Sequence, residues 1–182
     1  LPQRPYDIDR AKYHLKKAGL TGVRVPVFAS PAAEGSVDMA ALLQLSGIEA
    51  GMHFGINRVP ADGYWSNHWM KHPLGFGNIN PRVSLDELFS LFYKSDAPWN
   101  ESGWNNPQFD QLLAAARGEG DEAKRKQMYW DMQELISEHC GVSIPVFMNL
   151  IDGYDKRIKG NFPIPTGGLM GYSFAEYVWL DA

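Results

Sequence analysis

Strand-like and helix-like segments alternate along most of this chain, and this alternation most limits what it can fold into. Apolar residues at every second position predict strands over residues 23–27, 52–56, 74–78 and 142–148. Apolar residues recurring every three or four positions predict helices over residues 7–18, 36–46, 61–70, 84–92, 106–116 and 121–138. Helices that connect successive strands place those strands in parallel. The pattern therefore predicts an α/β fold with a mostly parallel or mixed sheet flanked by helices.

Polar residues that can cap a helix stand where several of these helices are expected to begin. Ser84 is followed three residues later by Glu87, which forms a capping box, and Asp7, Asn106 and Asp121 stand at three other starts. The apolar residues that recur with helix or strand spacing are expected to face inward. They predict a core that includes Phe109, Leu112, Leu113, Met132 and Ile144.

The composition changes near residue 150. Glycine and proline become frequent after this point and interrupt any regular pattern, although residues 174–180 could form a last strand. We therefore predict two parts, an α/β domain over residues 1–150 and a tail over residues 151–182.

Charge and hydropathy argue against a nucleic-acid partner and against a membrane-spanning helix. The net charge is −4 and the isoelectric point about 5.7, and no cluster of Lys and Arg of the kind that neutralises phosphates is present. Nucleic acid is therefore not an expected partner. No apolar run approaches the roughly 20 residues that a membrane-spanning helix needs.

No set of residues forms a recognisable catalytic or metal-binding motif. His68 and His72 are four apart on an expected helix, but no third ligand follows at motif spacing and no glutamate stands beside His68. Cys140 is the only cysteine and ends a helix, a position that disfavours a reactive thiolate. P-loop, dinucleotide-binding and serine-hydrolase motifs are missing from the sequence. We predict no catalytic residue, no cofactor and no metal.

Aromatic residues gather at two places. Tyr64, Trp65 and Trp69 lie within six residues, and Trp99 and Trp104 flank a polar loop. A single aromatic residue is more often part of a core. A cluster beside glycines and polar residues also suits a ligand-binding face, because flat rings supply contact area.

The order of five motifs resembles one family, the peptide/nickel-type (family 5) solute-binding proteins of ABC importers. The motifs are Tyr6–Gly19, Leu42–Ile48, Trp99–Ala116, Arg125–Glu134 and Ile144–Phe147. The stretch over Trp99–Ala116 is the most characteristic of them. Each motif is weak alone, but their order and spacing make chance an inadequate explanation.

The resemblance implies a receptor rather than an enzyme. Members of the family have two lobes that close on a ligand, and this chain matches the C-terminal part of one. Residues 1–150 would then be a ligand-binding lobe, and residues 151–182 would cross back toward the first lobe. The expected function is to bind a peptide or peptide-like solute outside the cytoplasm, in the periplasm or its equivalent. The expected partner is an ABC permease in the membrane. Two alternatives stay open: a hydrolase-type α/β enzyme, and a carbohydrate or opine receptor of the same family.

The resemblance also implies which residues face the ligand. Tyr64 and Trp65 correspond to an aromatic position that lines the cleft. A second segment corresponds to the turn that holds the peptide, and its candidate contacts are Asn78, Ile79, Asn80 and Arg82.

Two residues of that turn depart from the pattern of the peptide binders. Ile79 stands in place of a tryptophan, and Arg82 in place of an aspartate that meets the amino terminus of the peptide. An arginine there predicts that the ligand presents an anionic group, because a guanidinium binds carboxylate or phosphate in bidentate geometry. The alternative is a structural role for Arg82 paired with Asp86.

Overall fold

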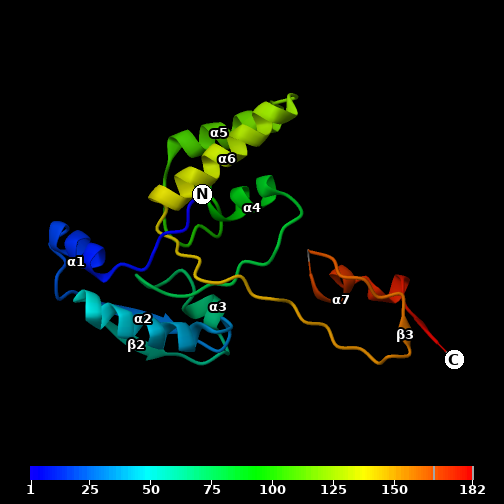
Figure 1. The fold of residues 1–182 in the computed structure, drawn as a ribbon, viewed down its shortest axis with the longest axis horizontal. Coiled ribbons are helices and arrows are strands. Elements are labelled where there is room, and N and C mark those ends of the chain that lie inside the picture. The colour runs from blue at the N-terminus through cyan, green and yellow to red at the C-terminus, as the bar shows by residue number, and fades with distance from the viewer. Residues whose placement is uncertain (166, 182) are drawn as a thin grey trace. The chain divides into compact units, whose positions relative to one another are not determined.

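The computed structural model describes residues 1–165 and 167–181. The chain forms two compact units, Leu1–Asn78 and Ile79–Ala182. Figure 1 shows the elements of both units along the chain. Within the described residues, no helix has the length and apolar character needed to cross a membrane.

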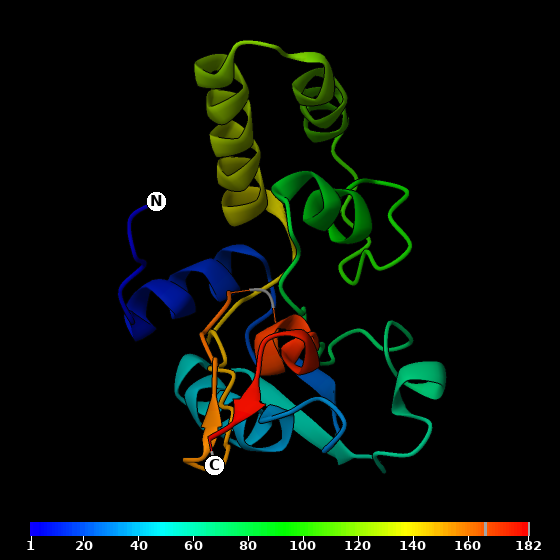
Figure 2. The same cartoon turned by 90° about the vertical axis from the view of Figure 1, so that its right-hand side faces the viewer.

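The N-terminal unit is built on a β-α-β element. It begins with α1 (Ile8–Lys17), followed by β1 (Arg24–Ala29), α2 (Ser36–Ala50), β2 (His53–Arg58) and the short α3 (Tyr64–Asn67). β1 pairs with β2 in parallel, with Val25 opposite Phe54 and Val27 opposite Ile56. The parallel pairing predicted from the alternating pattern is confirmed, and the two views of the ribbon show α2 packed along the strands (Figures 1 and 2).

The core of this unit lies between α2 and the two strands. Val27, Ala29, Ala40 and Phe54 are its buried residues. A side chain at Gly47 would meet the ring of Phe54, because a Cβ built there comes 2.5 Å from two ring carbons. The helix can therefore lie close to the sheet. It also runs past the predicted end at residue 46 and stops at Gly51, whose φ of 89° is available to glycine at little cost.

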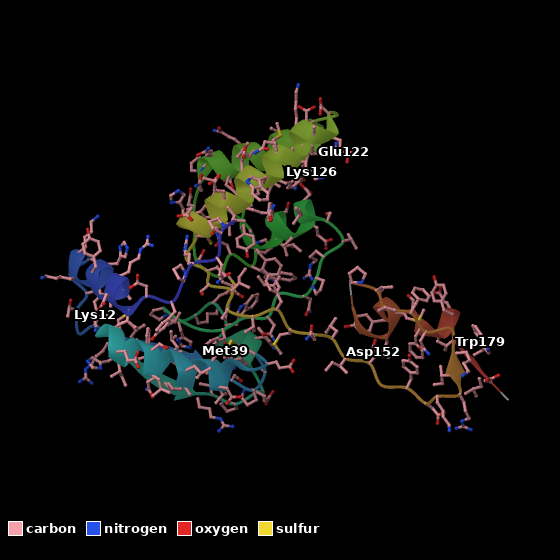
Figure 3. The ribbon with its side chains drawn as sticks, in the orientation of Figure 1. Lys12, Met39, Glu122, Lys126, Asp152 and Trp179 are labelled. Atoms are coloured by element: carbon pink, nitrogen blue, oxygen red, sulfur yellow. The ribbon has the colours of Figure 1, made fainter. Side chains whose placement is uncertain are left out.

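The C-terminal unit begins with three helices. They are α4 (Leu85–Phe92), α5 (Pro107–Gly118) and α6 (Glu122–His139). The three caps predicted for this unit are confirmed: the side chains of Ser84, Asn106 and Asp121 each accept a hydrogen bond from a backbone N–H in the first turn. Figures 1 and 2 show α5 and α6 side by side. Glu122 and Lys126 lie on the exposed surface of the first turns of α6 (Figure 3).

The buried residues of this unit come from all three helices and the turn after α4. They are Phe89, Phe92, Tyr93, Phe109, Leu113, Ala116 and Met132. Leu112 packs against this cluster while partly exposed. Four of the five predicted core residues therefore lie in the core or at its edge.

The prediction that Ile144 is the fifth core residue was wrong. Its side chain is 53% exposed, and residues 142–148 form no strand. A strand needs a hydrogen-bonded neighbour, and in the part of the chain that the structure describes this segment has none. The predicted strand over residues 74–78 is reduced to a single parallel bridge with β1, between Phe28 and Gly75.

The residues after 150 form short elements. β3 (Ile158–Lys159) pairs antiparallel with β4 (Trp179–Leu180), and α7 (Gly168–Gly171) and the 3₁₀ turn η1 (Phe174–Glu176) lie between them. The last strand predicted over residues 174–180 is thus confined to its final part. The predicted α/β class is confirmed, with a smaller sheet than expected. The domain boundary near residue 150 stays a prediction.

Candidate functional site

The buried side chain of Tyr64 links the start of α3 to the loop that follows this helix. Its side chain is 1% exposed. Its hydroxyl donates a hydrogen bond of 2.7 Å to the backbone carbonyl of Phe76. The residue begins α3 directly after Gly63, whose φ is 72°. Tyr64 thus ties the start of α3 to the end of the loop, and its ring is covered by protein in this unit.

Trp65 is the exposed member of the aromatic cluster. Its side chain is 43% exposed, and its ring meets those of Tyr64 and Trp69 edge to face, with centroids 5.1 Å and 5.7 Å away. Such edge contacts fix the ring without covering it. Trp65 therefore offers the contact area that the sequence predicted for this segment.

The expected helix over residues 61–70 is shorter than predicted and ends at Asn67. His68 is the C-cap of this helix, with a non-helical φ of −123°, and Met70, two residues further on, has a left-handed φ of 58°. The turn brings Nδ1 of His68 within 3.0 Å of Nε2 of His72. No group of three possible metal ligands occurs among residues 1–165 and 167–181. Sequence spacing marked this pair, but it gave no sign that the two rings bond to each other.

Asn78 closes the N-terminal unit. In the amide orientation that satisfies its neighbours, its side chain donates to the carbonyl of Gly77 at 3.2 Å. It then accepts from the N–H of Glu34 at 3.1 Å. Asn78 thereby joins the end of the unit to the loop after β1.

The other three candidate contacts belong to the C-terminal unit. Ile79 packs against the core of that unit, and Asn80 is exposed. The division of the chain between Asn78 and Ile79 therefore separates the six predicted residues into two groups of three. Tyr64, Trp65 and Asn78 share one unit, and Ile79, Asn80 and Arg82 share the other.

Arg82 is turned inward onto its own unit. Its side chain is 19% exposed. Nη1 donates to the carbonyls of Asn80 and Pro81, at 2.9 Å and 3.2 Å. The guanidinium carbon lies 5.6 Å from the ring centre of Phe92 and 5.7 Å from that of Trp99. These contacts favour the structural role over an anion-binding one.

The acidic partner of Arg82 differs from the predicted one. Nε of Arg82 lies 3.6 Å from Oε1 of Glu87, whereas Asp86 accepts a 2.7 Å bond from Arg117. The expectation that residues four apart have neighbouring side chains comes from helix geometry. α4 begins at Leu85, so Arg82 lies before the helix and the spacing rule does not apply to it.

Arg82→Ala is expected to lower the free energy of unfolding by about 1–3 kcal/mol. The change removes two hydrogen bonds from a charged donor and two cation–π contacts. Urea denaturation followed by circular dichroism measures the loss. Arg157→Ala is the matched control, because Arg157 is exposed and pairs only locally with Asp155, so its loss is expected to be too small to resolve. Equal stability of the two variants would show that the contacts of Arg82 do not hold the turn.

Cys140 is the C-cap of α6 in the C-terminal unit. Its sulfur is 3.4 Å from the hydroxyl of Ser102, which is not a base, and the residue packs against the helical core. Nearby Tyr93 is buried, and this burial chiefly raises its pKa to about 12, with smaller contributions from Cys140 and Glu101. Tyr93 is therefore uncharged over the physiological pH range.

Comparison with known proteins finds one similar curated protein and several similar solved structures. No family model matches the chain. The chain is 29% identical over 82 residues to the dipeptide-binding protein DppE of Bacillus subtilis, covering 45% of this chain and 14% of that protein.

Two solved structures share the fold. HbpA2 from Haemophilus parasuis matches 100% of this chain and 37% of its own, with 21% identity and a TM-score of 0.71. The dipeptide-binding protein from Pseudoalteromonas sp. SM9913, in complex with Met-Leu, matches 72% of this chain and 28% of its own, with 26% identity and a TM-score of 0.63. The chain thus spans well under half the length of the relatives it matches.

Proposed function

We propose that this chain, which has the fold of one part of the peptide/nickel-type solute-binding proteins that its motifs predicted, binds a peptide or peptide-like solute for an ABC importer. The sequence match to a dipeptide-binding protein is the observation that carries the proposal. The structural match to a protein holding Met-Leu supports it. The same relatives are binding proteins, which supports a receptor without a reaction of its own.

The mechanism follows from the way such receptors work. A ligand that contacts the closed arrangement better than the open one shifts the population toward closure. The closed receptor then docks on a membrane permease, outside the cytoplasm. This chain would supply one wall of the binding site, and the permease is its proposed partner.

Within that wall, Trp65 is the residue we assign to the ligand. It is exposed, and its orientation is fixed by contacts with two neighbouring rings. The ring of Tyr64 contacts that of Trp65, and Tyr64 is itself held in place by its hydrogen bond to the carbonyl of Phe76. Asn78, Ile79 and Asn80 remain proposed contacts through their backbone or side chains. Arg82 would shape the turn that follows them rather than bind the ligand.

Trp65→Ala is expected to weaken peptide binding by the complete protein at least about thirtyfold, the range of an aromatic hot spot. Calorimetry with a peptide panel measures the affinity, after native mass spectrometry has identified any co-purified ligand. Trp130→Ala is the control, because Trp130 is similarly exposed but lies on α6. Unchanged affinity in Trp65→Ala would remove this residue from the site.

The same measurements separate the alternatives. Binding of oligosaccharides or opines, with no binding of peptides, would overturn the proposed ligand class while leaving the receptor function. Turnover of any co-purified ligand would overturn the receptor function itself. The dipeptide-binding relatives favour neither alternative.

A further inference from the structure

The two histidines after α3 form a near-linear hydrogen bond. Nδ1 of His68 and Nε2 of His72 are 3.0 Å apart, and the ring centroids are 5.3 Å apart. The distance between the centroids exceeds the distance between the nitrogens by about two ring radii, one for each ring. Both nitrogens therefore lie on the line that joins the two centroids. The rings are inclined by only 29°. The bonding axis of each nitrogen therefore points at the other ring.

This geometry suits a shared proton better than a metal ion. A chelated metal needs both nitrogens aimed at a common third point, and here each is aimed at its partner. The bond requires one nitrogen to donate and the other to accept. It exists when the pair is neutral and is strengthened when the pair holds one extra proton. A second extra proton removes the acceptor and places two positive charges side by side.

Ring stacking connects the pair of histidines to β1. The ring of His72 lies flat on the ring of Phe28 in β1, with centroids 3.4 Å apart and an angle of 7°. The ring of His68 faces that of Tyr64 at the start of α3, with centroids 6.2 Å apart. The stack thus connects α3 and the loop after it to the sheet of the same unit.

The rings that contact the pair carry no charge at neutral pH. Phe28 faces it from β1 and Tyr64 from α3, and Lys71 is the charged residue in the turn between the two histidines. Within the described parts of the chain, no ion pair involves either histidine. Among the described residues, no carboxylate therefore lies within ion-pair distance of either ring.

We propose that His68 and His72 form a pH-sensitive latch. The latch holds residues 64–76 against β1 while the pair has at most one extra proton, and it opens when both rings are protonated. Protonation of the second ring removes the acceptor, so acidification opens the latch. The proposal rests on the N-terminal unit alone and does not depend on the identity of any ligand.

Hydrogen exchange over residues 64–76 tests the latch. After correction for the intrinsic pH dependence of exchange, amides in this segment are expected to exchange about five- to tenfold faster at pH 5 than at pH 7.5, the loss expected for one hydrogen bond. In His72→Gln and His68→Gln the ratio between the two pH values is expected to fall toward one. His53→Gln is the control, because His53 is exposed on β2, and it should behave as the unaltered protein.

An NMR titration of histidine-labelled protein provides the independent readout. The ring signals of His68 and His72 are expected to move together in two steps, whereas that of His53 moves in one. Three results would overturn the latch: a single common step for all three rings, exchange over residues 64–76 that does not change with pH, or saturable shifts of both ring signals on adding equimolar Zn²⁺. The last would make the pair a metal site instead.

Discussion

Leu113→Ala is expected to destabilise the C-terminal unit by about 2–5 kcal/mol. The side chain is 1% exposed and lies in the cluster formed by α4, α5 and α6. Removing it deletes buried methyl groups and leaves a cavity that the surrounding helices can close only in part. Urea denaturation followed by circular dichroism gives the change in free energy.

Leu42→Ala is the matched control for this experiment. Leu42 also lies within a helix, but on the exposed surface of α2. The two variants remove the same atoms, so the difference between them reports burial alone. If both lost the same amount of stability, Leu113 would not be a core residue and the assignment of α5 would be wrong.

Tyr64→Ala is expected to cost about 3–5 kcal/mol, the range for removing a large buried aromatic side chain. Tyr64→Phe separates the hydroxyl from the ring. It is expected to cost about 1–3 kcal/mol, because the carbonyl of Phe76 loses its hydrogen-bond donor. Denaturation of the N-terminal unit measures both variants.

Tyr6→Phe controls for the loss of a hydroxyl. Tyr6 is exposed and its hydroxyl donates to Glu49 at the surface, so water can replace that bond. Its removal is expected to be nearly neutral. A loss in Tyr64→Phe no larger than in Tyr6→Phe would mean that the bond to Phe76 does not secure the loop.

Local signals predicted most of the fold. The caps at Ser84, Asn106 and Asp121 bond to amides two or three residues away, so the neighbouring sequence contains all that decides them. Residues 142–148 have an equally regular pattern and form no strand. An alternating pattern of apolar residues indicates a preference for the extended conformation. A strand also needs a neighbouring strand to bond to, and the local sequence does not show whether one is present.

The candidate site was predicted less well, because exposure is a property of the whole unit. Tyr64 and Trp65 are neighbours with similar side chains, yet one is covered and the other is open. Arg82 forms an ion pair with Glu87 rather than Asp86, since it lies before the helix on which the spacing rule depends. The bond between His68 and His72 depends on the left-handed backbone of Met70, a conformation uncommon for that residue type.

The close contact between Gly47 and Phe54 predicts that the residue types at these two positions depend on each other. Glycine inside a helix is less favourable than alanine by about 1 kcal/mol, and here the ring opposite occupies the space that a methyl group would need. A larger residue at position 47 can be accepted only with a smaller one at position 54. Related chains that have lost the glycine should therefore also have lost the phenylalanine, and the pair should vary together as a unit.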